Sequence, residues 1–220
     1  NYQEAVAVYT ELQTYKDSQS LLLFTSYSYA QQLFSQRKYE HAAAVFYKIR
    51  SYLDSNDYYL ESTYLLAHKY LDEKNIDKAM EFFSKVNDYK DSKQIYIQIK
   101  FDNAKAKYLV GDFTTAKILF KEIPENPDAK TFLAKIEALQ SLQGTWLDNV
   151  LGTVKYVIDG WKLDIYAENK YILTENISES NVSATKITFS CAIAPCTYDV
   201  LSNSLYFTFE GTPMYMHKTN

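Results

Sequence analysis

The sequence predicts an α+β protein in two domains, an α-helical hairpin solenoid followed by a small antiparallel β-meander that forms a barrel or a sandwich. Two observations predict this fold class. The phrase Tyr-x-Asp-Ser returns every 37 residues in the first part of the chain, and a fixed period of about 20–50 residues is typical of solenoid arrays. After Gln143 the period ends, and short alternating apolar and polar runs replace it, as in β-strands. We therefore place the solenoid at residues 1–142 and an all-β domain at 143–220.

The recurring phrase sets the register of the array. It starts at Tyr15, Tyr52 and Tyr89, and a degenerate copy starts in the same register at Asn126. Apolar positions keep the same register, in three sets whose members are 37 residues apart: Ala5, Ala42, Ala79 and Ala116; Tyr9, Phe46, Phe83 and Phe120; Leu12, Ile49, Val86 and Ile123. Because the sequence opens inside a unit, we expect a partial first unit, three full repeats to about residue 129, and a chain that is a piece of a longer protein.

Each unit is predicted to hold two antiparallel helices joined by a short polar turn. Apolar residues of the second helix are spaced to lie on one face of an α-helix, as in Tyr39, Ala42, Phe46 and Ile49. The first helix shows a similar stripe in Leu23, Tyr27, Ala30 and Phe34. The small alanines allow a neighbouring helix to approach closely.

The Asp-Ser pair falls where one unit ends and the next helix begins. Asp and Ser are favoured N-cap residues, because a side-chain oxygen accepts a hydrogen bond from a free N–H group of the first turn. Ser is replaced by Ala129 in the last copy, so we assign the cap to the aspartates, which are Asp17, Asp54, Asp91 and Asp128. A ladder of aspartates that binds metal or phosphate is disfavoured, because they lie a full repeat apart.

The last unit departs from the pattern at Pro124 and Pro127, which stop the preceding helix. Phe132, Ile136 and Leu139 then predict one more helix over 129–142, which caps the open end of the array.

Ala30, Ala42, Phe46 and Ile49, with Tyr39 opening the second helix, resemble the small, aromatic and apolar signature of tetratricopeptide repeats. The resemblance covers residues 2–141. The unit has 37 residues, about three more than that family's usual length, lacks its Trp, and lacks its proline near the repeat end in the first three copies. It implies a right-handed array whose first helices line a concave groove. The longer variant with Tyr-x-Asp-Ser resembles repeats of envelope-associated proteins of Gram-positive bacteria, which implies a bacterial cell-envelope or extracellular location.

The second domain is predicted to contain seven or eight short strands. Asp159-Gly160 is a two-residue hairpin signal between the runs 154–158 and 161–166. Further runs cover 171–177, 185–191, 197–201, 205–209 and 214–217. The opening Gly144-Thr145-Trp146 resembles the start of lipocalin-like barrels, which implies that Trp146 plugs one end. At this length we expect a barrel filled by its own side chains.

Several classes of function have no support in the sequence. The net charge is −4 and neither domain is basic, which disfavours nucleic acid as a partner. The chain has no apolar run of membrane-spanning length, so we expect no membrane contact. His41, His68 and His217 lack metal-ligand spacing, and there is no phosphate-binding Gly loop or nucleophile motif. We therefore expect no metal, no cofactor and no enzymatic activity.

The favoured function is protein–protein interaction or scaffolding, with a protein or peptide partner held in the groove of the first helices. Candidate contacts are one aromatic residue per repeat and the residue one turn further on, namely Tyr27 with Gln31, Tyr64 with His68, and Phe101 with Lys105. Large aromatic side chains often anchor interfaces. The alternative is that these three rings pack between helices.

A second hypothesis places the function in the β domain. A small apolar or glycan ligand would bind in a cavity lined by Trp161, Tyr166 or Tyr171, with the repeats as a spacer. Cys191 and Cys196 either form a disulfide across a hairpin loop or are two buried thiols.

Overall fold

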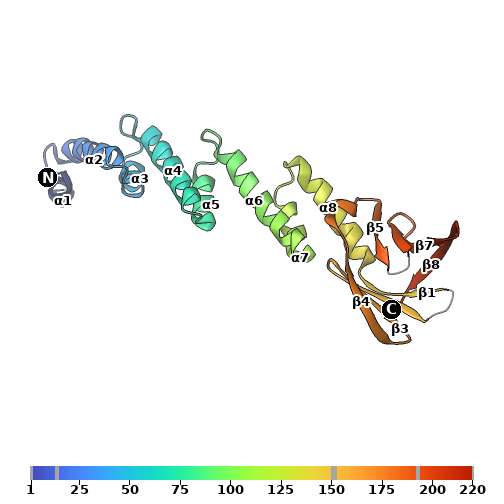
Figure 1. The fold of residues 1–220 in the computed structure, drawn as a ribbon. Coiled ribbons are helices and arrows are strands. Elements are labelled where there is room, and N and C mark those ends of the chain that lie inside the picture. The colour runs from blue at the N-terminus through green and yellow to red at the C-terminus, as the bar shows by residue number, and fades with distance from the viewer. Residues whose placement is uncertain (1, 13–14, 150–152, 192–193, 220) are drawn as a thin grey trace. The chain divides into compact units, whose positions relative to one another are not determined.

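A computed structural model describes residues 2–12, 15–149, 153–191 and 194–219 (Figure 1). Eight α-helices come first in the described chain, and eight β-strands follow. This order confirms the predicted α+β layout. The chain divides into two compact units, Asn1–Ile99 and Lys100–Asn220, which we describe separately.

Long and short helices alternate along the chain in step with the 37-residue period. The long first helices, α2, α4 and α6, have 18 residues each. The helix bounds are α1 (Tyr2–Leu12), α2 (Ser18–Ser35), α3 (Tyr39–Lys48), α4 (Ser55–Asp72), α5 (Ile76–Lys85), α6 (Ser92–Leu109), α7 (Phe113–Lys121) and α8 (Pro127–Leu142).

The core of the first unit is built from the repeated alanine and aromatic positions. Ala42 and Phe46 of α3 are fully buried. The ring of Phe46 stacks on Tyr58 of α4 at 5.0 Å between centroids and meets Tyr27 of α2 edge-on at 6.0 Å. The aromatic residue of α3 is therefore held between the first helix of its own repeat and that of the next.

The Tyr-x-Asp-Ser motif forms a tight turn, and its second residue has a left-handed backbone conformation. Lys16, Leu53 and Lys90 have φ of 48°, 47° and 50°. The fourth copy has Pro127 at this position, and proline holds φ near −65°. The left-handed turn is therefore impossible there, and α8 begins at Pro127, two residues earlier than predicted, with Asn126 as its N-cap.

The strands of the second unit form one antiparallel sheet with the order β4-β3-β2-β1-β8-β7-β6-β5. A short 3₁₀ helix, Glu179–Asn181, lies between β4 and β5. These two end strands approach each other, so the sheet is a nearly closed barrel. The strand bounds are β1 (Gly144–Asp148), β2 (Val154–Asp159), β3 (Lys162–Ala167), β4 (Lys170–Asn176), β5 (Lys186–Cys191), β6 (Ala194–Asp199), β7 (Ser204–Phe209) and β8 (Thr212–Lys218).

Two strands begin earlier than their predicted runs and include a proline. β6 begins at Ala194 and contains Pro195, and β8 begins at Thr212 and contains Pro213. Each proline pairs with a neighbour on one side only, because the pairing of β6 with β7 begins at Cys196 and that of β8 with β1 begins at Met216. A proline without a ladder partner on its N–H side is tolerated in a strand.

Helix α8 packs against the sheet within the second unit. Ile136, Leu139 and Leu142 of α8 are fully buried. The indole Nε1 of Trp146 donates to the Leu142 carbonyl at 2.8 Å, and the Tyr198 hydroxyl donates to Ser141 Oγ at 2.9 Å. Trp146 thus joins the last helix to the start of the sheet.

Candidate functional site

Tyr27 and Tyr64, two of the predicted groove residues, connect successive repeats through their hydroxyl groups. Tyr27 Oη donates to the carboxylate of Asp54, and Tyr64 Oη donates to Asp91 Oδ1 at 2.7 Å. In both pairs the tyrosine lies on a first helix, and the aspartate belongs to the turn that follows 27 residues later. The aspartates therefore have a different role from the one predicted.

The N-cap prediction for the aspartates is correct in position at two helices and wrong in its hydrogen bond. Asp17 and Asp54 occupy the N-cap positions of α2 and α4, but neither side chain accepts a capping hydrogen bond. Asp128 lies inside α8, where Asn126 Oδ1 instead accepts from the N–H groups of Asp128 and Ala129. The carboxylate of Asp91 accepts the Tyr64 hydroxyl, because the left-handed turn leaves it beside the preceding repeat.

The tyrosine–aspartate pairs change the acidity of both tyrosines and of Asp91. Its hydrogen bond to Asp54, together with burial, raises the pKa of Tyr27 to about 12. Burial and the bond to Asp91 raise the pKa of Tyr64 to about 12. The same hydrogen bond from Tyr64 lowers the pKa of Asp91. Near neutral pH the tyrosines are thus protonated donors and Asp91 is an ionised acceptor.

The residues one turn further on lie against these tyrosines. Gln31 Nε2 donates to Tyr27 Oη at 2.8 Å. The His68 ring lies 4.4 Å from the Tyr64 ring and 5.1 Å from the Phe83 ring, between centroids. His68 Nε2 is buried and has no hydrogen-bond partner among the described residues.

The third predicted pair lies in the second unit and differs in character. Phe101 is 8% exposed and packs against Phe120 and Phe132, at 5.6 Å from each ring. Lys105 Nζ lies 5.9 Å from the Phe132 ring centroid. Phe101 has no hydroxyl, so it cannot make the bond that Tyr27 and Tyr64 make.

An apolar groove that the sequence reasoning missed runs across α3, α4 and α5. Its volume is about 450 Å³, and we call it the α3–α5 groove. It is lined by Glu40, Ala43, Ala44 and Tyr47 of α3, Tyr59, Thr63 and Leu66 of α4, and Phe82 and Lys85 of α5.

Aromatic rings form both walls of the α3–α5 groove. The Tyr47 ring lies 5.2 Å from that of Tyr59, and Tyr47 is 51% exposed. Across the groove the Phe82 ring stacks on a further α4 ring, Tyr70, at 5.5 Å. The groove therefore combines an apolar floor with accessible aromatic surface.

Cationic groups lie over both walls of the α3–α5 groove. The Arg50 guanidinium lies 5.0 Å from the Tyr47 ring centroid, and Lys85 Nζ lies 4.3 Å from that of Phe82. Lys85 also pairs with Glu81 at 2.6 Å.

The wall residues of the groove are positions where the repeat changes. Tyr47 corresponds to Ser84 one unit later, and Phe82 corresponds to Val45 one unit earlier. The solenoid packing therefore does not require these aromatic residues. Departure from the period was the signal in the sequence that could have revealed them.

The three residues proposed for a ligand cavity in the β domain do not come together. Trp161 Nε1 donates to the Tyr108 carbonyl at 3.0 Å, and its ring packs on Phe113 at 5.4 Å. Tyr166 and Tyr171 form a ring pair at 5.8 Å near the other end of β3. The inward positions of the strands are instead buried apolar residues: Tyr156, Ile158, Leu163, Ile165, Ile187, Phe189, Tyr198, Leu205 and Phe207.

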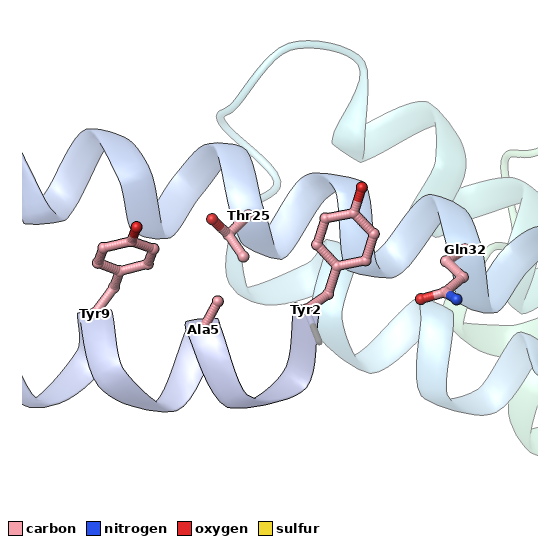
Figure 2. A pocket seen from close by; sticks show the side chains of 5 residues that line it. All are labelled: Tyr2, Ala5, Tyr9, Thr25 and Gln32. Atoms are coloured by element: carbon pink, nitrogen blue, oxygen red, sulfur yellow. The ribbon is translucent and has the colours of Figure 1, made fainter.

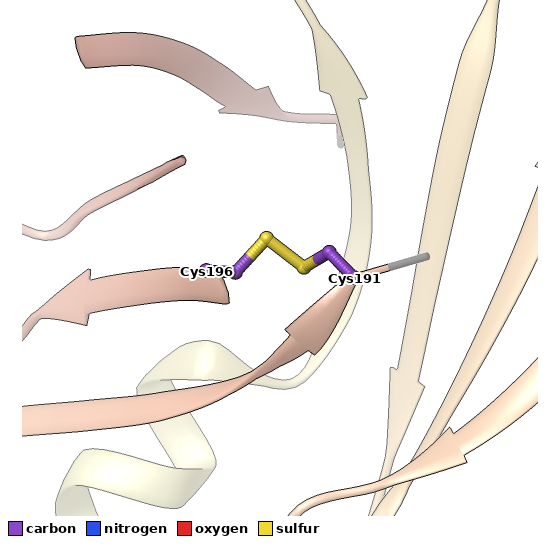
Figure 3. Close-up of a disulfide and its surroundings, with 2 residues drawn as sticks. All are labelled: Cys191 and Cys196. Carbon is purple, nitrogen blue, oxygen red and sulfur yellow. A yellow bond between two sulfur atoms is a disulfide. The ribbon is translucent and has the colours of Figure 1, made fainter. Parts of the chain in front are cut away.

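Cys191 and Cys196 form a disulfide at the end of the β5–β6 hairpin (Figure 3). Both residues are fully buried, and their Cα atoms are 5.8 Å apart. The two cysteines are not directly opposite each other, because Phe189 pairs with Cys196 and Cys191 pairs with Ala194. This register makes them diagonal neighbours on the same face of the hairpin, close enough for a bridge.

The described residues contain no group of three or more His, Cys, Asp or Glu side chains that could hold a metal ion. None of the helices in the described ranges combines the length and the apolar character needed to cross a membrane. Comparison of the chain with protein families, with curated proteins and with solved structures finds no match.

Proposed function

We propose that the chain is a non-enzymatic protein-interaction module, in which the α3–α5 groove binds an amphipathic helix of a partner protein. The groove itself is the observation that carries this proposal. Its volume of about 450 Å³ lies in the range of binding pockets. A groove lined by three helices, with an apolar floor, suits a helix that inserts side chains at i, i+3 or i+4 and i+7.

The α3–α5 groove supports this function better than the surface around Tyr27 and Tyr64. The hydroxyl groups of those two tyrosines are occupied by Asp54 and Asp91, and their rings serve contacts between repeats. Tyr47, in contrast, is half-exposed at a position where the repeat needs no aromatic residue.

Charge at the groove restricts the partner. Arg50 and Lys85 lie over the two aromatic walls, and Glu40 is part of the lining. Lys85 is paired with Glu81, whereas Arg50 is exposed above Tyr47. We therefore expect a partner helix with an apolar face and an acidic residue at the end that meets Arg50.

A displayed library of amphipathic helical peptides tests the proposal. Selected peptides should bind the native chain and lose at least tenfold in affinity with the double variant Tyr47→Ser and Phe82→Val. Each substitution copies the residue that an adjacent repeat carries at the same position, so the fold should be kept. Phe24→Ala, at a 59% exposed aromatic residue outside the groove, is the control. Equal binding to the double variant would refute the groove as the site.

We further propose that the helical array is tetratricopeptide-like and that the β domain is lipocalin-like. The alternation of long and short helices, with Ala30, Ala42 and Phe46 fully buried at the signature positions, supports the first proposal. The nearly closed eight-stranded meander, with Trp146 buried at its start, supports the second.

We also propose that the protein works outside a reducing cytosol, in keeping with a cell-envelope or extracellular location. The Cys191–Cys196 disulfide supports this, because structural disulfides persist mainly in oxidising compartments. Alkylation of free thiols in intact cells of the source, followed by mass spectrometry, tests it. Quantitative alkylation of both cysteines without prior reduction would refute it.

A further inference from the structure

The first helices of the first unit lie between two second helices. Helix α2 packs against α1 on one side and α3 on the other, and α4 packs against α3 and α5. Figure 2 shows the side of α2 toward which α1 directs Tyr2, Ala5 and Tyr9. On the opposite side, Tyr27 and Ala30 of α2 belong to the cluster around Phe46 of α3. A first helix inside the array is therefore covered on two sides.

Helix α8 has the register of a first helix, but a second helix does not follow it in the described chain. Helix α7 packs against it on one side, and the chain continues with β1 at Gly144. Ala138 and Ser141 of α8 occupy the register of Tyr27 and Ala30, the α2 residues that face a second helix. Ala138 is nevertheless fully buried. Another element therefore covers this side of α8.

The β-sheet provides this cover through contacts from three strands. The Tyr198 hydroxyl of β6 donates to Ser141 Oγ at 2.9 Å, and Lys218 Nζ of β8 donates to the Ser141 carbonyl at 2.9 Å. Trp146 Nε1 of β1 donates to the Leu142 carbonyl at 2.8 Å. All three bonds end on the last turn of α8. The sheet therefore lies where the second helix of a fourth unit would pack.

The tip of the β2–β3 hairpin makes a second contact with the helices. The Trp161 ring lies 5.2 Å from the Tyr108 ring of α6 and 5.4 Å from the Phe113 ring of α7. Its Nε1 donates to the Tyr108 carbonyl at 3.0 Å. Gln143, the C-cap of α8, accepts from the Gly160 N–H at 2.5 Å and donates to the Gly160 carbonyl at 3.3 Å. One hairpin tip thus binds α6, α7 and the end of α8.

Gly111, in the turn between α6 and α7, departs from the repeat at the point of this contact. The two earlier repeats carry Arg37 and Lys74 at the same position, and all three residues have a left-handed backbone. That backbone therefore accepts a long side chain in the earlier repeats. A β-carbon at Gly111 would lie 3.5 Å from Trp161 Cδ1 and 3.7 Å from Gly160 Cα. The glycine thus occurs in the repeat whose turn backbone lies against the hairpin.

We infer that the β domain is the C-terminal cap of the helical array, and that Trp161 is the side chain that couples it to the last repeat. The end of a solenoid exposes the apolar face that a further repeat would bury, and a cap closes that face. Here the sheet covers α8 and the hairpin binds the α6–α7 turn. Helices α7 and α8 should therefore open together with the strands, as one cooperative unit. This role does not depend on the α3–α5 groove.

Hydrogen exchange of the full chain, measured by mass spectrometry of its peptides, tests this cap. Trp161→Ala should raise the exchange rates of α7 and of β2–β3 by similar factors of about tenfold or more, because the packing and the hydrogen bond of the indole are both lost. Trp161→Phe should raise both by about fivefold, as expected for one lost hydrogen bond. Tyr171→Ala, at a 59% exposed aromatic residue near the other end of β3, is the control and should leave α7 unchanged. Peptides from α3 to α5 should keep their native rates in all three variants.

Two results would overturn the inference. In the first, Trp161→Ala accelerates exchange in the strands while α7 and α8 keep their native rates, so the sheet does not protect the helices. In the second, neither the strands nor the helices change, so the Trp161 contact does not couple them. If Trp161→Ala unfolds the whole sheet, Trp161→Phe supplies the same comparison, and acceleration confined to the β2–β3 hairpin would again overturn the inference.

Discussion

Replacement of Ser55 by alanine should stabilise the protein. Ser55 begins α4 and is fully buried, and its hydroxyl has no hydrogen-bond partner among the described residues. A buried hydroxyl without a partner destabilises the folded state by about 1–3 kcal/mol. Ala129 occupies the same position of the 37-residue period, as the third residue of α8, and is 1% exposed. The position therefore requires a small side chain, and we expect Ser55→Ala to raise the free energy of unfolding by about 1 kcal/mol, the lower end of that range.

Urea unfolding followed by circular dichroism at the helical band measures this change. Ser51→Ala, at an exposed serine of the same connection, is the matched control and should change the free energy of unfolding by less than about 0.5 kcal/mol. Ser55→Leu should lower it by about 1–3 kcal/mol, because Ser55 is fully buried and a larger side chain overpacks the site.

One result would refute the reasoning. If Ser55→Ala lowers the free energy of unfolding by about 1 kcal/mol while the Ser51 control is unchanged, the hydroxyl makes a stabilising hydrogen bond of the capping kind.

Four further predictions concern other contacts. The pKa of Tyr64 is raised to about 12. The contribution of Tyr64 to the stability of the folded state is therefore complete below the ordinary tyrosine pKa of about 10 and is lost as the pH rises to 12. In Tyr64→Phe, a titration followed by tyrosinate absorbance should show one fewer tyrosine that ionises at high pH. Because the pKa of Asp91 is lowered, its contribution to the stability of the folded state is present above about pH 4 and is lost as the pH falls further. Asp91→Asn should therefore have a lower free energy of unfolding at neutral pH, and this free energy should depend less on pH during acid unfolding. Replacement of both Cys191 and Cys196 by alanine should lower the free energy of unfolding by about 2 kcal/mol, because the disulfide closes a short loop. Two reactive thiols in the unsubstituted chain, denatured without a reducing agent, would contradict the bridge. Trp161→Phe should lower the free energy of unfolding by about 1 kcal/mol, because the indole N–H bond to a backbone carbonyl is lost; an unchanged urea midpoint would contradict this.

The period and its helical spacing were sufficient to predict the helices. Residues 37 apart repeat one local environment, and spacings near 3.6 place them on one face, so the alternation of α2 with α3 and α4 with α5 followed directly. The hairpin at Asp159-Gly160 could also be predicted from local sequence, because these two residues are sufficient to specify the turn.

The predictions failed where a side chain could meet several partners. Asp54 occupies the predicted N-cap position of α4, but its carboxylate makes no capping hydrogen bond. The carboxylates of Asp54 and Asp91 instead accept the hydroxyl groups of Tyr27 and Tyr64 across the repeat boundary. Sequence spacing cannot distinguish these two acceptor roles, because the left-handed turn that aims the carboxylate is a property of the folded backbone. Pro127, read only as a helix stop, in fact forbids that turn and begins α8.

The class of fold could be predicted without a structure, because the repeat period, the helical stripes and the change to alternating runs are all local properties of the chain. The candidate groove, in contrast, depends on how helices from different repeats pack together. The α3–α5 groove exists because Tyr47 and Phe82, from different repeats, are brought to opposite walls across α4.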